Sequence, residues 1–198
     1  MCINHDEVCI SSCIDFDVAA PTPCIVARVH TKELHRAPKV VTKAGAWKLG
    51  GKANMPRTAF PLAHGRSYQL GAKWMWRVDQ LEALGRECRL LTAFNSEKRG
   101  FMAMLTVRQG QDFVVVASYE FHSDHPGWHV HASCSDIGEI GLALSRPRDA
   151  LRIPAVRAIH RPRNSVDVTE AGALNIALKF FNVVGKAEQE NSRQGSLL

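Results

Sequence analysis

Short apolar segments separated by turn-forming residues fill the middle of the chain. The segments are "CRLLTAF", "FMAMLTV", "FVVVASYEFH" and "WHVHASC", and the stretches between them are "NSEKRG", "RQGQD" and "SDHPG". Each apolar segment has the length of a strand, and the intervening Gly, Pro, Asn, Asp and Ser residues favour tight turns. This pattern predicts an antiparallel meander of strands across residues 88–134.

Two other segments have the spacing of a helix. In "KWMWRVDQLEALGRE", the apolar residues Trp74, Val78, Leu81 and Leu84 recur every three or four positions, which predicts a helix that ends near Gly85. A shorter helix is expected within "SDIGEIGLALS".

A second long helix is predicted near the C-terminus. "DVTEAGALNIALKFFNVVG" has the apolar spacing of a buried helix, with Asp167 and Glu170 as a capping box and Gly185 as its end. The expected fold class is α+β, with an antiparallel sheet of four to five strands and helices packed on one face. We expect an irregular leader over 1–30, a single α+β domain over 31–186 and a flexible tail over 187–198.

The net charge of +6 is unevenly distributed. Eleven Lys and Arg residues lie between Arg28 and Arg77, against the single acid Glu33. Such a segment favours a polyanionic partner, above all nucleic acid, and Trp47, Trp74 and Trp76 are candidates for base stacking. The alternative is a solvated face with core tryptophans. A second basic stretch, residues 146–163, holds six arginines and is either a phosphate-binding loop or a soluble connector.

The sequence indicates a cytoplasmic protein without a membrane span. No apolar run approaches the roughly 18 residues that a membrane helix needs, and Asp6 and Glu7 stand where a signal peptide would be basic. The six cysteines include no C-x-x-C pair, so we expect reduced thiols and no second metal site at the N-terminus.

The segment "YEFHSDHPGWHVHASC", residues 119–134, contains four of the nine histidines. If "SDHPG" forms the turn, His122 lies opposite His129 and Glu120 opposite His131, and all four side chains share one face because strand residues alternate. Tyr119, Phe121, Trp128 and Val130 then form the apolar reverse face. Three imidazoles and a carboxylate that converge in this way suit a divalent metal ion, whereas the alternative is a solvated polar face. His125 is expected to be an exposed turn residue.

These residues resemble a known motif. The run from His122 through Asp124 and His129 to His131 is similar to the metal-binding motif of the HUH endonucleases, in the three-histidine form of the relaxases. The strand that precedes it also resembles the rolling-circle replication initiators, in which a Glu is a ligand. The resemblance implies a five-stranded antiparallel sheet and a divalent ion, Mg²⁺ or Mn²⁺ with Zn²⁺ possible. It also implies that His122, His129, His131 and Glu120 are ligands, with Asp124 in support.

In that superfamily a tyrosine attacks the scissile phosphate of single-stranded DNA or a DNA hairpin, which leaves a 5′-phosphotyrosine and a free 3′-hydroxyl. The chain has two tyrosines, and the strand pairing turns Tyr119 away from the histidines. Tyr68 lies upstream, as in relaxases, and is therefore the candidate nucleophile; the alternative is an ordinary half-buried tyrosine. The basic residues expected to contact DNA are Arg66, Lys73, Lys48, Lys52 and Arg57. A relative that has lost cleavage and only binds DNA is the second hypothesis.

A third hypothesis is a zinc metallopeptidase. His125-Pro followed by Ser133-Cys-Ser-Asp136 resembles the second half of the JAMM motif, in which two histidines, a serine and an aspartate surround the zinc ion. That motif has its histidines two residues apart, whereas His122 and His125 are three apart, which on a strand places them on opposite faces.

Overall fold

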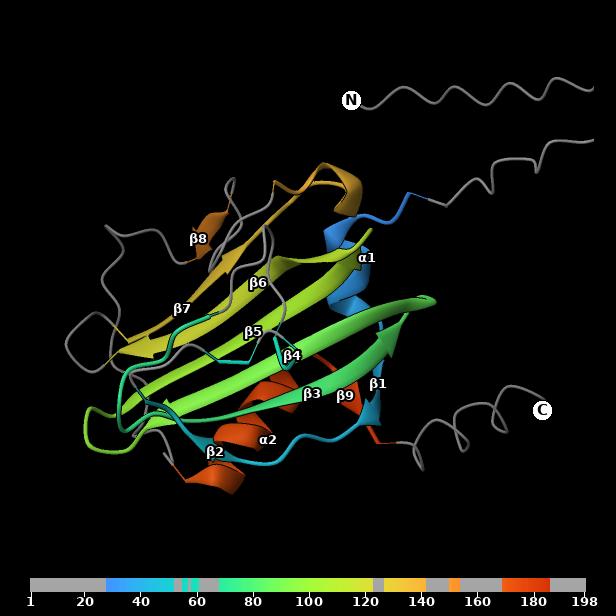
Figure 1. Cartoon of the computed structure of the whole chain (residues 1–198). Coiled ribbons are helices and arrows are strands. Elements are labelled where there is room, and N and C mark those ends of the chain that lie inside the picture. The colour runs from blue at the N-terminus through green and yellow to red at the C-terminus, as the bar shows by residue number, and fades with distance from the viewer. Residues whose placement is uncertain are drawn as a thin grey trace, which may run out of the picture.

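One mixed β-sheet is the main feature of the part of the protein that the structure describes (Figure 1). The computed structural model describes residues 28–51, 55–56, 58–60, 68–122, 127–141, 150–153 and 169–185. Within these ranges it has nine strands in one sheet: β1 (Lys39–Lys43), β2 (Lys48–Leu49), β3 (Met75–Ala83), β4 (Arg86–Asn95), β5 (Gly100–Gln109), β6 (Asp112–His122), β7 (Gly127–Ala132), β8 (Leu151–Ile153) and β9 (Val183–Val184). The helices are α1 (Thr31–Arg36), α2 (Glu170–Phe180) and the short 3-10 helix η2 (Ile137–Glu139).

The strands follow the order β8-β7-β6-β5-β4-β3-β1-β9, with β2 paired to β3. All neighbours are antiparallel except β1 and β9. The predicted meander is confirmed as β4 to β7. The sheet is larger than the expected four to five strands, because β3 and several short strands at both edges extend it. The described part of the chain is therefore largely β.

The helix predicted to end near Gly85 in the segment 73–87 was wrong, because this segment contains β3 and the start of β4. The buried side of β3 carries a polar pair, in which the Arg77 Nε donates to Asp79 Oδ2 at 3.0 Å and the backbone N–H of Gly45 donates to Asp79 Oδ1 at 2.8 Å. Asp79 is 1% exposed. A buried ion pair interrupts the apolar alternation that identifies a strand, and the remaining apolar residues imitate helical spacing.

A two-residue turn joins β3 to β4. Ala83 pairs with Arg86, and the turn residues Leu84 and Gly85 have φ values of 50° and 68°. Two consecutive positive φ values are typical of a type I′ turn, which matches the twist of an antiparallel hairpin. Leu84, expected on the inner face of a helix, is 51% exposed.

The predicted C-terminal helix is confirmed as α2, with different ends. Its N-cap is Thr169, whose side chain accepts a hydrogen bond from the Gly172 N–H, so the predicted Asp167 cap is wrong. Asp167 itself lies outside the described residues. The helix ends before Asn182, which has a φ of 51°, rather than at Gly185. Asn is one of the few residues that tolerate this left-handed conformation after a helix.

Each face of the sheet has its own apolar core. The core beneath α2 includes Leu81, Leu90, Phe101, Leu105, Val114, Val116, Ala173, Ala177 and Phe181. The opposite core includes Met55, Phe60, Leu70, Trp76, Leu91, Met102, Met104 and Val115. The Arg89 guanidinium donates to the carbonyl oxygens of Thr58 and Ala59 at 2.6 and 2.8 Å. These hydrogen bonds attach the described part of the 55–60 segment to the face of the sheet opposite α2.

A β-bulge in β6 reverses which residues face each core. Thr106 pairs with Val115, but the adjacent Leu105 pairs with Ala117, so Val116 is an extra residue. An extra residue shifts the alternation of the strand by one position. Before the bulge, the odd-numbered residue Val115 faces the core that contains Met102 and Met104. Beyond the bulge, the even-numbered residues of β6 lie on that same face.

Most of the expected leader (1–30) and all of the expected tail (187–198) lie outside the described residues. The short helix expected in "SDIGEIGLALS" is the 3-10 helix η2. Neither α1 nor α2 is long and apolar enough to cross a membrane, nor is any other helix in the described ranges.

Candidate metal centre

The β6-β7 hairpin brings together Glu120, His129 and His131. Glu120 pairs directly with His129, Ser118 pairs with His131, and His122 pairs with Gly127. The predicted pairs, His122 with His129 and Glu120 with His131, were wrong, because the observed register is shifted by two residues from the expected one. A shift of two residues keeps every side chain on its predicted face.

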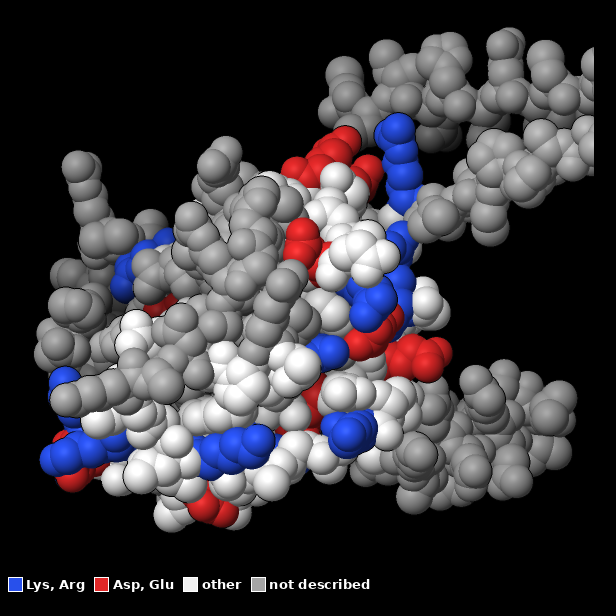
Figure 2. Space-filling model, in the orientation of Figure 1, with Lys and Arg blue, Asp and Glu red and all other residues white. Residues whose placement is uncertain are grey.

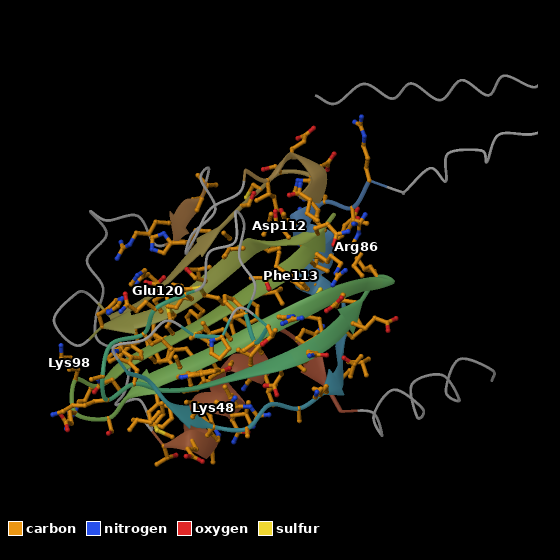
Figure 3. All side chains as sticks on the ribbon, viewed as in Figure 1. Lys48, Arg86, Lys98, Asp112, Phe113 and Glu120 are labelled. Carbon is orange, nitrogen blue, oxygen red and sulfur yellow. The ribbon has the colours of Figure 1, made fainter. Side chains whose placement is uncertain are left out.

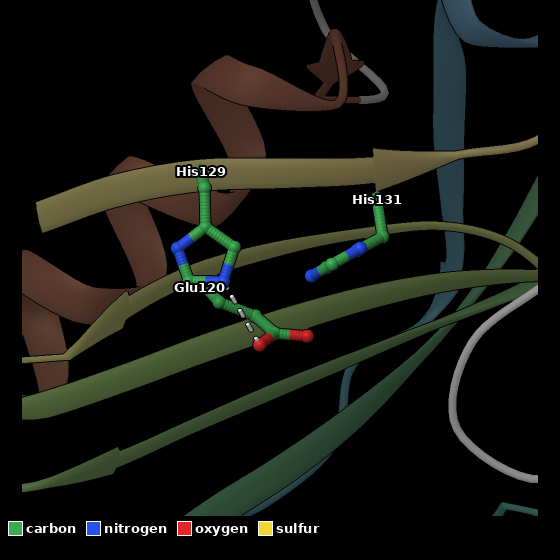
Figure 4. A group of neighbouring side chains, drawn as sticks. All are labelled: Glu120, His129 and His131. Carbon is green, nitrogen blue, oxygen red and sulfur yellow. Dashed lines mark ion pairs between the residues drawn. The ribbon is translucent and has the colours of Figure 1, made fainter. Parts of the chain in front are cut away.

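The three side chains converge on one point (Figure 4). Their nearest ligand atoms all lie within 4.8 Å of one another. His129 and His131 project from β7, and the Glu120 carboxylate reaches toward both from β6, with 3.4 Å between Glu120 Oε2 and His129 Nε2. Glu120, His129 and His131 are 3%, 4% and 8% exposed. A buried carboxylate beside two imidazoles is a group that could bind a metal ion.

His122 lies on the same face but outside this group. Its Nε2 is 3.2 Å from Glu120 Oε2, and its ring centroid is 5.5 Å from that of His129. Its side chain is 34% exposed, because His122 is the last residue of β6. The structure thus brings together three of the four predicted ligands. The fourth, His122, contacts the Glu120 carboxylate from the side that is exposed to solvent.

Two hydrogen bonds orient the ligand atoms. Ser118 Oγ donates to Glu120 Oε1 at 2.8 Å, which leaves Oε2 directed toward the histidines. His129 Nδ1 lies 3.2 Å from the Gly127 carbonyl oxygen, which can only accept, so Nδ1 carries the proton and Nε2 presents its lone pair. Burial lowers the pKa of His129, although the Gly127 carbonyl and the Glu120 charge act in the opposite direction. The imidazole is therefore neutral near pH 7, as a metal ligand must be.

Ser118 is a site residue that sequence reasoning missed. It precedes Glu120 by two positions, so its place on the same face of a strand was the available signal. The sequence offered no sign that this hydroxyl rather than another polar group would contact the carboxylate.

Tyr68 and Glu120 line the same cavity. The cavity has a volume of about 320 Å³, and its walls also include His122, Trp74, Met102 and Met104. The Tyr68 hydroxyl donates to Met102 Sδ at 3.4 Å, and Met102 pairs with Glu120 across β5 and β6. Tyr68 precedes Glu120 by 52 positions in the sequence, yet both residues line this cavity.

Tyr119 lies on the opposite face, as expected. Its ring stacks on Phe180 of α2 with centroids 3.9 Å apart, and on Trp128 at 4.7 Å. The aromatic stack fixes the orientation of the hairpin, with the histidines directed away from α2.

The predicted DNA contacts are only partly described. Lys48 is exposed on β2, with its Nζ 5.4 Å from the centroid of the Trp76 ring, and Lys73 forms a 2.7 Å ion pair with Glu97. The remaining predicted contacts, Arg66, Lys52 and Arg57, lie outside the described residues, as does Asp124. On the described part of the face in Figure 2, basic side chains occur as separate patches near β2 and β3. Lys48 and Glu120 lie well apart (Figure 3).

The three tryptophans expected to stack on bases have different environments. Trp76 is 5% exposed, and Trp47 packs edge-on against Phe94 with centroids 5.3 Å apart. Trp76 is therefore a core residue, and Trp47 is partly buried against the core beneath α2. Trp74 lines the cavity of Glu120 and Tyr68, and it is the one of the three placed to meet a ligand there.

The structure describes only some of the residues of the metallopeptidase hypothesis. Asp136 forms a β-bridge with His30 and lines a separate cavity with Arg86 and Arg108. His125 lies outside the described residues. Asp136 is not part of the Glu120, His129 and His131 group within the described ranges.

The fold and the site together define a largely β protein with a candidate metal centre of two histidines and one carboxylate. The chain matches no protein-family model, and no curated protein or solved structure is significantly similar to it.

Proposed function

We propose that the protein is a metal-dependent, HUH-type endonuclease that nicks single-stranded DNA through Tyr68. The observation that carries this proposal is the double role of Glu120. Its carboxylate belongs to the group with His129 and His131, and it also borders the cavity that Tyr68 lines. A metal centre and a candidate nucleophile thus have one ligand-sized space in common.

The donor set supports a divalent ion with affinity for both nitrogen and oxygen. Imidazole ligands suit Zn²⁺ or Mn²⁺ better than Mg²⁺, which prefers an all-oxygen environment. Three protein ligands leave coordination positions for a substrate. When bound, such an ion polarises a phosphoryl oxygen and stabilises the charge that develops during displacement at phosphorus.

The chain itself supplies the nucleophile and its orientation. In the cleavage step the Tyr68 oxygen forms a bond to phosphorus and the bond from phosphorus to the 3′-oxygen breaks. The phenolic proton is lost from Tyr68, and the leaving 3′-oxygen takes up a proton. In this structure the Tyr68 hydroxyl donates a hydrogen bond to Met102 Sδ. This hydrogen bond must break before the Tyr68 oxygen can attack the phosphorus atom.

Lys48 supports DNA binding at a distance from the centre. Lys48, Trp76, Ala93, Met102 and Glu120 are successive cross-strand partners on β2 to β6. Four strand spacings correspond to about 19 Å, so Lys48 would contact a phosphate remote from the one at the metal.

The test is cleavage of end-labelled single-stranded oligonucleotides with Mn²⁺, Mg²⁺ or Zn²⁺. We expect a covalent protein-DNA adduct that survives denaturation and is abolished by Tyr68→Phe. Tyr119→Phe is the matched control, because that ring lies on the opposite face and should leave the adduct unchanged. An adduct that persists in Tyr68→Phe would refute the assigned nucleophile.

DNA binding that requires His129 and His131 but never yields an adduct would instead identify a non-cleaving binder. If the protein bound no metal ion, both hypotheses would be wrong.

A further inference from the structure

An arginine from the edge of the sheet lies beside the metal centre. Strand β8 pairs with β7, and within that pair Arg152 is the direct partner of His131 (Figure 1). Directly opposed residues of antiparallel strands project from the same face, with Cβ atoms about 5 Å apart. The Arg152 side chain therefore starts on the face of Glu120, His129 and His131.

The burial pattern of β8 agrees with this direction. Leu151 and Ile153 are 56% and 57% exposed, whereas Arg152 between them is only partly exposed. Alternate residues of a strand project to opposite faces, so Arg152 is directed to the face of His131 and its two apolar neighbours are directed away from it.

The positive charge of Arg152 belongs to a side chain that starts directly opposite the candidate ligand His131. A cation beside a bound divalent ion is repelled by it, and an anion between the two relieves this repulsion.

We propose that Arg152 binds the phosphoryl group of the substrate at the metal centre. This inference rests on the proposed function, since it assigns a further residue to the same site. A guanidinium presents parallel N–H donors that match two oxygens of one phosphoryl group, whereas a lysine in its place offers a single point charge. Arg152 holds the non-bridging oxygens from the β8 side, and the ligands on β6 and β7 hold the metal on the other.

The test separates anion binding from metal binding. The full-length protein, its Arg152→Gln and Arg152→Lys variants, and the control Arg36→Gln are each loaded with Zn²⁺ and titrated with inorganic phosphate. Arg36 is an exposed residue at the end of α1, away from the centre. We expect Arg152→Gln to weaken phosphate binding at least tenfold, Arg152→Lys to weaken it less, and Arg36→Gln to leave it unchanged. Acetate, a carboxylate probe, should bind more weakly than phosphate to the unaltered protein.

Zinc affinity provides the second readout. A merely structural role for Arg152 predicts weaker zinc binding in Arg152→Gln, whereas a substrate-binding role predicts zinc binding that is unchanged or tighter, because a like charge has been removed. Phosphate binding that is equal in Arg152→Gln, Arg152→Lys and the unaltered protein would overturn the inference, as would tighter binding of acetate than of phosphate.

The two proposals fail in different ways. Phosphate binding and DNA cleavage that do not respond to Arg152→Gln would refute the role of Arg152 and leave the nuclease intact. Phosphate binding that depends on Arg152, without any DNA cleavage, would support this inference and refute the nuclease. A protein that takes up no metal ion would refute both.

Discussion

Replacing Ser118 with alanine should weaken metal binding without unfolding the protein. Ser118 is completely buried, and its hydroxyl donates to Glu120 Oε1 at 2.8 Å. Without this donor the carboxylate has one partner fewer in a site that is almost closed to water. It then rotates or takes up a proton, and a metal ion must reverse either change in order to bind.

The size of the effect follows from the kind of hydrogen bond. A buried bond to a charged acceptor contributes about 1.5–3 kcal/mol. A loss of this size in binding free energy corresponds to roughly a 10- to 100-fold lower affinity, which is also the usual effect of removing a group that supports a metal ligand. In Ser118→Ala we therefore expect the Kd for Zn²⁺ to rise by that factor.

The assay is a competitive zinc titration against a chromophoric chelator at pH 7, with guanidinium unfolding in EDTA to measure the stability of the metal-free fold. Thr106→Val is the matched control, because it removes a buried hydroxyl of β5 that donates to the Arg89 carbonyl oxygen at 3.2 Å. A folded Ser118→Ala variant with an affinity within about twofold of the unaltered protein would show that Glu120 is not an oriented ligand.

Two further predictions concern the stability of the fold. Gly45→Ala should lower the free energy of unfolding by about 1–3 kcal/mol, because an added Cβ overlaps the Val78 carbonyl oxygen; Gly51→Ala, where a Cβ meets nothing within 4 Å, is the control for thermal or denaturant unfolding. The second prediction concerns pH. Burial lowers the pKa of Lys39 from 10.5 to about 8, so the folded state gains stability as pH rises through the folded pKa. Between about pH 7 and pH 9 the gain should be about 1 kcal/mol, and Lys39→Met should abolish it. Above pH 9 the buried Cys88, whose pKa burial raises to about 12, opposes the gain, so a steady rise to pH 11 would contradict the assignment.

The polar and apolar faces of the hairpin were predictable from the sequence. Side chains of a strand alternate, so the separation of Glu120 and the histidines from Tyr119 and Trp128 survives an error of two residues in register. The direct cross-strand partner of each residue, by contrast, is predicted wrongly when the register is in error by two residues. Gly127 begins β7 with a φ of 78° instead of closing the turn, and this displaces the expected partner of every residue in the hairpin.

The nature of β3 was not predictable from periodicity. Its inward-facing polar pair, Arg77 and Asp79, is stabilised by a contact with Gly45, more than thirty positions away in sequence. Only the tertiary structure shows that these charges are buried and paired. For the same reason the position of Arg152 could not be derived, since it depends on the pairing of a three-residue strand with β7.

The bulge at Val116 places Val115 and Glu120 on the same face of β6, although they are five positions apart. If Val116 instead took a regular place in the alternation, Tyr119 and Phe121 would share the face of Val115, and Glu120 would be turned into the core beneath α2. Deleting Val116 would place Ala117 directly after Val115, keep the pairing that both residues have with β5, and leave Glu120 on the face of His129 and His131. During evolution, a single-codon deletion at this point would therefore preserve the site, whereas substitutions would change its ligands one at a time.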